Sequence, residues 1–133
     1  NNPISHRLEI EELTSLEVIV DDVIYMPSLE APSDKPYPFV YFITIKNNSN
    51  QKVKIFGRKW ILTSKDGQKL VVEGEGVVGQ FPEILAGEEF NYNSYHVISC
   101  DSQVGGAFFG ETNNGIPIYT KIPSFELTIP KWA

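Results

Sequence analysis

Three glycines at G-x-G-x-x-G spacing, Gly74, Gly76 and Gly79, are the residues whose type and spacing most directly suggest chemistry. In dinucleotide-binding proteins this spacing joins a strand to a helix whose N-terminus holds a pyrophosphate. Here two valines stand inside the motif and Gln-Phe-Pro follows it at residues 80–82. Proline lacks an N–H and keeps the preceding residue extended. We therefore predict a glycine-rich loop between strands, and we do not expect a nucleotide or pyrophosphate to bind there.

Arg58 and Trp60 form a second candidate pair, two residues apart and so on one face of a strand. A guanidinium beside an indole can bind an anion or stack on a partner. The alternative is that Trp60 lies in the core while Arg58 pairs with a nearby carboxylate. This alternative is favoured because aromatic side chains usually fill cores, and Arg58 is kept as a candidate binding residue.

The sequence contains little that indicates a metal-binding site or a catalytic nucleophile. The histidines are His6 and His96, the single cysteine is Cys100, and no zinc or calcium ligand spacing is present. His96 fits a packed strand residue, and no two carboxylates are singled out by their spacing. We expect no metal, no cofactor and no catalytic residue, so the chain is not expected to be an enzyme. An enzyme acting on phosphoanhydrides is the third alternative.

The charge and composition exclude several classes of partner. The chain has 133 residues and a net charge of −6, which repels nucleic acid phosphates. The eleven basic residues are scattered, so neither a nucleic acid nor a membrane is expected as a partner. No run reaches the roughly 20 apolar residues of a membrane span. One cysteine fits a reducing compartment, and we expect a cytoplasmic location.

The hydrophobic pattern predicts strands rather than helices. Apolar residues recur at every second position within the expected strands, and turn signals recur every eight to twelve residues. This pattern is typical of an antiparallel β-sandwich or barrel. Residues 1–15 form a polar N-terminal extension, loose or in a short helical turn, and residues 16–133 form the domain. The expected strands cover residues 16–20, 23–25, 37–46, 53–64, 70–73, 90–98, 104–110 and 116–129. The residues expected in the core are Phe39, Tyr41, Ile43, Trp60, Phe125 and Leu127.

Two further local features are predicted along the chain. Asp66-Gly67 favours a hairpin with a type I′ turn, because Asp and Gly tolerate its positive φ angles. Gly57 interrupts a strand and predicts a bulge or a close approach of two backbones.

Taken together, the motifs resemble those of the ApaG (CorD) domain family over residues 16–130. The pattern includes Tyr37-x-Phe39-x-Tyr41-x-Ile43-x-Ile45-x-Asn47, then Arg58-x-Trp60-Ile61, and most specifically the segment 72–82, followed by segments 86–94 and 122–130. The resemblance implies an all-β, immunoglobulin/fibronectin type III-like antiparallel β-sandwich of about seven strands. It also implies a protein-interaction module, with an association of bacterial members with cobalt/magnesium resistance or efflux. Between Ser99 and Phe108 the chain departs from the family pattern and keeps only Gly106 of that motif.

We predict from these features a non-enzymatic protein–protein interaction module whose partner is an unidentified protein. The glycines allow close approach of another chain, and an aromatic residue flanked by polar ones is favoured at interfaces. The expected binding residues are Gly74, Glu75, Gly76, Gly79, Gln80, Phe81 and Arg58. The alternative is an anion or nucleotide (pyrophosphate) bound by the Gly74–Gly79 loop, with Arg58 or Lys59 supplying charge.

Overall fold

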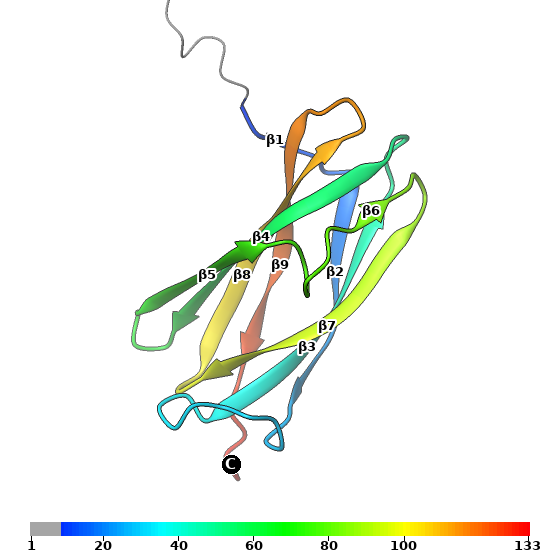
Figure 1. The fold of residues 1–133 in the computed structure, drawn as a ribbon. Helices are drawn as coiled ribbons and strands as arrows, with labels where there is room; N and C mark the ends of the chain where they lie inside the picture. The colour runs from blue at the N-terminus through cyan, green and yellow to red at the C-terminus, as the bar shows by residue number, and fades with distance from the viewer. Residues whose placement is uncertain (1–8) are drawn as a thin grey trace, which may run out of the picture.

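The computed structural model describes residues 9–133, and strands, turns and loops make up this part of the chain (Figure 1). Its strands are β1 (Glu11–Glu12), β2 (Leu16–Tyr25), β3 (Tyr37–Asn47), β4 (Val53–Ser64), β5 (Lys69–Glu75), β6 (Glu83–Ile84), β7 (Glu89–Ile98), β8 (Ser102–Thr112) and β9 (Pro117–Leu127). The prediction of an all-β chain is confirmed. Of the predicted N-terminal extension, residues 1–8 lie outside the described residues, and β1 pairs in parallel with β9 instead of forming a helical turn.

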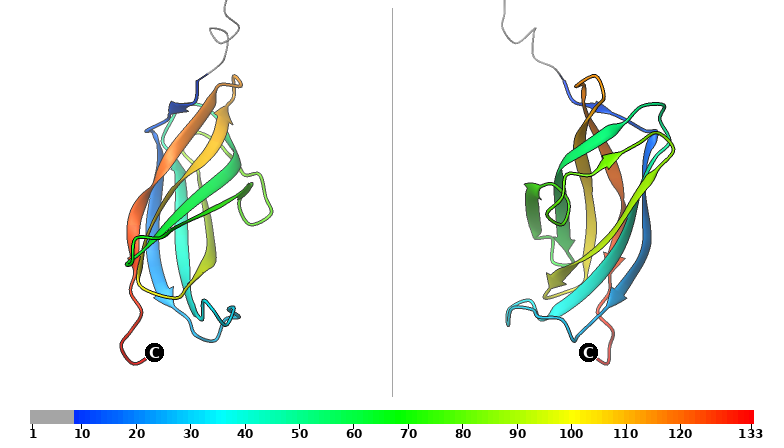
Figure 2. Two further views of the ribbon diagram at one scale, coloured as in Figure 1. Left: turned by 90° about the vertical axis from the view of Figure 1, so that its left-hand side faces the viewer. Right: turned by 45° about the vertical axis from the view of Figure 1, so that its right-hand side comes forward.

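The strands form two sheets that pack face to face (Figure 2). One sheet has the order β2-β3-β7; the other has the order β1-β9-β8-β4-β5, with β6 also paired to β4. Apart from the two-residue strands β1 and β6, three long strands face four long strands. The long strands pair in antiparallel fashion. The predicted sandwich of about seven strands is therefore confirmed.

The core lies between the sheets and follows the alternation of the strands. On β3, Phe39, Tyr41, Ile43 and Ile45 are buried on one face, as period-two patterning requires. The core prediction is confirmed for every residue except Phe125, which is only partly buried.

A bulge in β4 decides which of its side chains face the core. The pairing of β4 with β8 shifts between Ile55 and Gly57, close to the position where the glycine predicted it. Because one residue is extra, Ile55 and Trp60 both point inward, with 0% and 1% exposure. Without the shift, strict alternation would turn Trp60 toward solvent.

The turn at Asp66-Gly67 corrects the sequence-based expectation. A type I′ turn needs positive φ at both central residues, but Gly67 has φ 89° while Asp66 is not in the left-handed region. Ser64 N donates to Gln68 O, and Gly67 N donates to Ser64 O, each over 2.8 Å, which makes a three-residue loop. The side chain of Asp66 accepts hydrogen bonds from Ser64 Oγ and Gln68 N and thereby stabilises this three-residue loop.

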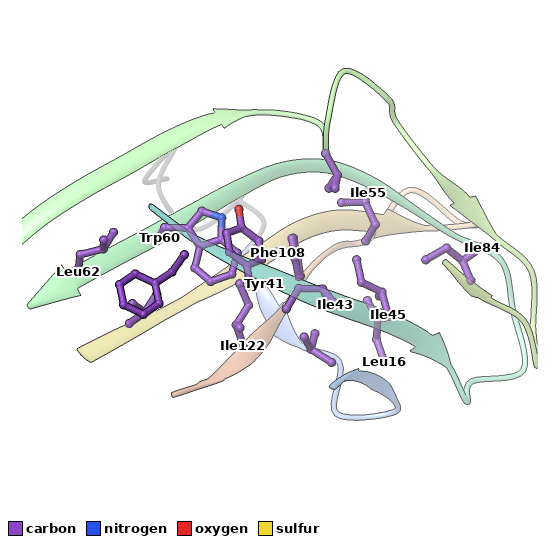
Figure 3. Close-up of a cluster of buried hydrophobic side chains, with 14 of the residues drawn as sticks. Leu16, Tyr41, Ile43, Ile45, Ile55, Trp60, Leu62, Ile84, Phe108 and Ile122 are labelled. Atoms are coloured by element: carbon purple, nitrogen blue, oxygen red, sulfur yellow. The ribbon is translucent and has the colours of Figure 1, made fainter. Parts of the chain in front are cut away.

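Trp60 is the centre of an aromatic cluster that joins the two sheets (Figure 3). Its ring centroid lies 4.8 Å from those of Tyr41 and His96, and 6.4 Å and 6.1 Å from those of Phe108 and Phe125. These contacts reach β3, β7, β8 and β9. Edge-to-face and tilted rings of this kind stabilise a core by about 0.5–1.5 kcal/mol per pair beyond the area buried.

His96 is packed inside this cluster, as the sequence analysis expected. It is 9% exposed and lies 4.7 Å from the Tyr41 ring, centroid to centroid. Its Nε2 has no hydrogen-bond partner among the described residues. Burial lowers the pKa of His96 to about 4, because the imidazolium ion would lose its hydration.

The depressed pKa of His96 predicts a loss of stability on acidification. Between pH about 6.5, the unfolded value, and pH about 4, the folded value, the unfolded chain binds a proton that the folded chain does not. The free energy of unfolding should therefore fall as pH decreases through this window, by up to about 3 kcal/mol from this group alone. Urea denaturation between pH 7 and 4 measures it. His96→Phe should have the shallower pH dependence; equal slopes in both proteins would contradict the assignment.

Candidate functional site

The glycine loop interrupts an edge strand. β5 and β6 pair one after the other with the same side of β4. Where β5 ends, Gly76 N donates to Phe56 O over 2.5 Å, and where β6 begins, Ile55 N donates to Pro82 O over 2.9 Å. The loop therefore leaves and rejoins the sheet at neighbouring residues of β4, and it protrudes in the left view of Figure 2. The predicted loop between strands is confirmed.

The tip of the loop is a two-residue turn. Val77 and Gln80 exchange both backbone hydrogen bonds, over 2.8 and 2.9 Å, while Val78 has φ 44° and Gly79 φ 78°. Positive φ at both central residues defines a type I′ turn. Val77 is fully buried and anchors the turn in the core. Val78 is strained, since a β-branched residue is a rare outlier at positive φ.

Gly76 and Gly74 both lie in close contact with other parts of the chain. At Gly76, with φ 64°, a Cβ atom would lie 2.3 Å from the backbone oxygen of Gln80. At Gly74 a Cβ atom would lie 2.7 Å from Cζ of Arg58. The expectation that glycines of this loop serve backbone geometry is confirmed at Gly76, where φ is positive and the contact is with backbone, so only a residue without a side chain fits. At Gly74 the contact is with the end of the Arg58 side chain.

Arg58 holds the loop through its backbone. Its Nη1 donates to the carbonyl oxygens of Glu75 and Gly76, over 2.8 and 3.1 Å, and its guanidinium lies against Gly74. The sequence analysis expected a carboxylate or anion as its partner, but the structure places loop carbonyls there instead. Charge-assisted bonds to carbonyl oxygens are stronger than neutral ones, so Arg58 stabilises the conformation of the loop.

Arg58 also borders the aromatic cluster. Burial raises the pKa of Tyr41, and a hydrogen bond with Ser94 and the charge of Arg58 oppose that rise. Burial is likewise the main cause that raises the pKa of Tyr92. Both phenols therefore stay neutral at physiological pH, while the guanidinium close to them carries a charge.

The hydrogen bonds within the loop determine how many of its donors are free to bind an anion. The N–H groups of Gly76, Val77 and Gln80 are used within the protein, and the donors of Arg58 Nη1 face carbonyl oxygens. Anion-binding nests need successive N–H groups that converge on one point. Three of the loop's donors are thus turned away from any common acceptor.

Exposed apolar side chains surround the loop. Phe56 on the bulge, Val78 at the turn and Phe81 after it are 38%, 46% and 48% exposed. Phe56 and Phe81, together with Lys54 and Glu75, line a shallow depression, and Lys54 Nζ lies 5.5 Å from the centroid of the Phe56 ring. We refer to Phe56, Glu75, Val78, Gln80 and Phe81 as the loop surface. The sequence analysis missed Phe56 and Val78; the glycine next to Phe56 was the one signal for an outward-facing bulge.

In the part of the chain that the structure describes, no group of three or more His, Cys, Asp and Glu side chains could hold a metal ion. Residues 9–133 also contain no helix that is long and apolar enough to cross a membrane. The loop surface, where exposed apolar side chains surround the glycine loop, is the candidate functional site.

The glycine contacts predict different costs of substitution. Gly76→Ala should destabilise the protein by more than about 2 kcal/mol, because the new Cβ meets backbone as well as adopting positive φ. Gly79→Ala has open space around it and should cost only about 1 kcal/mol, from φ alone. Chemical denaturation of the two variants provides a matched comparison. Equal losses would show that contact with Gln80 does not restrict the loop.

The strain at Val78 predicts a stabilising substitution. Val78→Asn creates the Asn-Gly pair that type I′ turns prefer, so the free energy of unfolding should rise by about 1 kcal/mol. Val71→Asn, at an exposed residue of β5 without positive φ, is the control and should not stabilise. Thermal or urea unfolding of both variants measures the difference; a destabilised Val78→Asn variant would contradict the assigned turn.

Comparison with known proteins shows which family this chain resembles. The ApaG domain model matches residues 27–110, which include the loop. Protein ApaG of Vibrio atlanticus is 39% identical over 109 residues, covering 80% of this chain and 85% of that protein. Protein ApaG of Escherichia coli is 35% identical over 108 residues, covering 80% and 86%.

Solved structures agree with the sequence matches. A crystal structure described as an ApaA protein from Bordetella pertussis has a TM-score of 0.75 at 29% identity, over 92% of this chain and 99% of that one. An X-ray structure of a structural genomics target reaches a TM-score of 0.79 at 30% identity, over 90% and 91%. A late embryogenesis abundant protein, 14% identical with a TM-score of 0.57 over 87% of this chain and 73% of that one, shares the fold alone. With a matched family model and relatives along most of its length, the chain belongs to the ApaG domain family.

Proposed function

We propose that this chain is a non-enzymatic domain that binds another protein through the loop surface. The observation that carries the proposal is the exposure of Phe56 on the bulge of β4 and of Val78 and Phe81 on the loop that Arg58 holds. Phe56 and Phe81 line one depression. Apolar and aromatic groups with a polar rim are typical of the centre of protein interfaces. Glu75 and Gln80 supply the rim here.

The strain of Val78 supports the same proposal. A β-branched residue at positive φ lowers stability, and such strain concentrates at sites where function requires it. At this position Val78 exposes 46% of its surface, so its side chain contributes little to the core. An exposed apolar group at the tip of a rigid turn is suited to enter a pocket of a partner.

Anion binding through the same loop is the alternative that we rank second. It would require the guanidinium of Arg58 to leave the carbonyl oxygens of Glu75 and Gly76, to which it donates. It would also place a phosphate near the carboxylate of Glu75, on a chain with a net charge of −6. The loop therefore offers less to a pyrophosphate than to a protein.

The cellular setting follows from the same proposal. The loop surface contains a single carboxylate, Glu75, which is a poor ligand set for a divalent ion. In this proposal, the association of the family with cobalt and magnesium resistance is carried by the protein that is bound. We place that interaction in the cytoplasm, in keeping with the lone Cys100.

Affinity capture tests the proposal with paired variants. Immobilised wild-type chain should retain a specific protein that the double variant Phe56→Ala/Phe81→Ala does not retain. Ile116→Ala is the matched control, since Ile116 is 42% exposed but lies in the β8–β9 hairpin. The captured protein, once purified, should bind the double variant at least about tenfold more weakly than wild type. Val78→Asn should fold more stably and yet bind less well.

Two outcomes would contradict the proposal. One is recovery of the same protein by wild type and by a folded double variant with equal affinity. The other is a stoichiometric complex of the chain with pyrophosphate or ATP in calorimetric titration, at a dissociation constant of about 10 μM or below. The second result would favour the anion alternative.

A further inference from the structure

The outer edge of β5 is an open and unusually apolar sheet edge. Among the described residues β5 pairs only with β4, and it lies at the margin of the sheet in the right view of Figure 2. Leu70, Val71 and Val72 are consecutive and are 41%, 50% and 36% exposed. Natural edge strands usually avoid such runs because their free backbone groups pair with other strands. This edge is therefore built in a way that favours pairing.

The hydrogen-bond pattern shows which residues present free backbone groups. At one end of β5, Ser64 N donates to Gln68 O; at the other end, Gly76 N donates to Phe56 O. In an antiparallel pair, every second residue bonds to the neighbouring strand, and the β4–β5 register has no shift. Lys69, Val71 and Glu73 consequently turn their N–H and C=O groups toward the free edge.

The alternation of free and bonded backbone groups along β5 restricts how a second β5 strand could pair with it in antiparallel fashion. Two outward-facing residues must lie opposite each other, so only every second register is allowed. In the register centred on Val71, that residue meets its own copy, and Lys69 faces Glu73 on both sides of the two-fold axis. On the other face, Leu70 meets Val72. Shifting the register by one allowed step places Lys69 opposite Val71, or Val71 opposite Glu73.

The charges of this register are complementary. Glu73 has a side chain that is 66% exposed, and among residues 9–133 it forms one ion pair, with Lys59 over 3.9 Å. Lys69 makes no ion pair with any described residue. Opposite charges across an antiparallel pair are stabilising, and like charges are destabilising. Two such cross-strand pairs would form together with three apolar pairs.

We propose that a second copy of this chain binds along β5, so that the β5-containing sheets of the two copies join into one continuous sheet centred on Val71. The contact is isologous, because the same strand is used on both sides. It is a small interface of the kind that associates weakly. It goes beyond the proposed function, since it uses the edge of β5 and leaves the exposed side chains of the loop surface free.

Charge reversal tests the register. Sedimentation of the wild-type chain should show a monomer–dimer equilibrium with a dissociation constant below about 1 mM. Lys69→Glu and Glu73→Lys each place like charges opposite one another and should weaken the dimer about tenfold. The double variant Lys69→Glu/Glu73→Lys should restore it. Lys121→Glu, on an exposed residue of β9, is the control and should have no effect.

Cysteine pairing gives a second readout that does not depend on charge. In a Cys100→Ser background, Leu70→Cys and Val72→Cys chains should form a disulfide-linked dimer when mixed and oxidised. The paired Cα atoms would be about 4.5 Å apart, which a disulfide can span. Either variant alone should stay unlinked, because like residues are offset by about 7–8 Å.

The proposal is overturned by either of two results. One is a wild-type chain that remains monomeric up to about 1 mM. The other is a dimer that neither charge reversal weakens, which would place the contact elsewhere.

Discussion

Trp60 must be buried between the two sheets, and this requirement sets the direction of the residues around it on β4. Its ring contacts Tyr41 and His96 on one sheet and Phe108 and Phe125 on the other. Loss of a core aromatic of this size costs about 3–5 kcal/mol, a large part of the stability of a domain of this length. Once Trp60 points inward, Arg58 two residues earlier must do the same.

The position of Arg58 links the core to the glycine loop. An inward-pointing arginine near the open side of a sandwich cannot lose its hydration without hydrogen-bond acceptors. The backbone carbonyls of Glu75 and Gly76 supply them, and Gly74 leaves room for the guanidinium. The bulge at Phe56 lets Ile55 and Trp60 both face the core while Phe56 faces solvent. Loop conformation and exposed apolar surface thus have one origin, the register of β4.

Both proposed contacts lie on the same interrupted edge of the sheet. β5 ends at Glu75, the loop projects, and β6 resumes the pairing. Backbone groups along β5 are free to pair, whereas those of the loop are largely used internally. The edge therefore offers backbone hydrogen bonds at one end and apolar side chains at the other. Strand addition and side-chain docking are the corresponding modes of recognition.

Alternation and turn composition by themselves determined the all-β class, most strand boundaries, and the burial of Phe39, Tyr41 and Trp60, because strand periodicity and aromatic burial are local properties. The resemblance of the chain's ordered motifs to a known family indicated the family. Tertiary contacts decided the rest. The sequence favoured a type I′ turn at Asp66-Gly67, but the side chain of Asp66 stabilises another turn there. The type I′ turn occurs at Val78-Gly79, because buried Val77 and the two anchors on β4 outweigh the poor local propensity of valine. The partner of Arg58 likewise depended on which strand lay opposite, and no spacing along the chain encodes that.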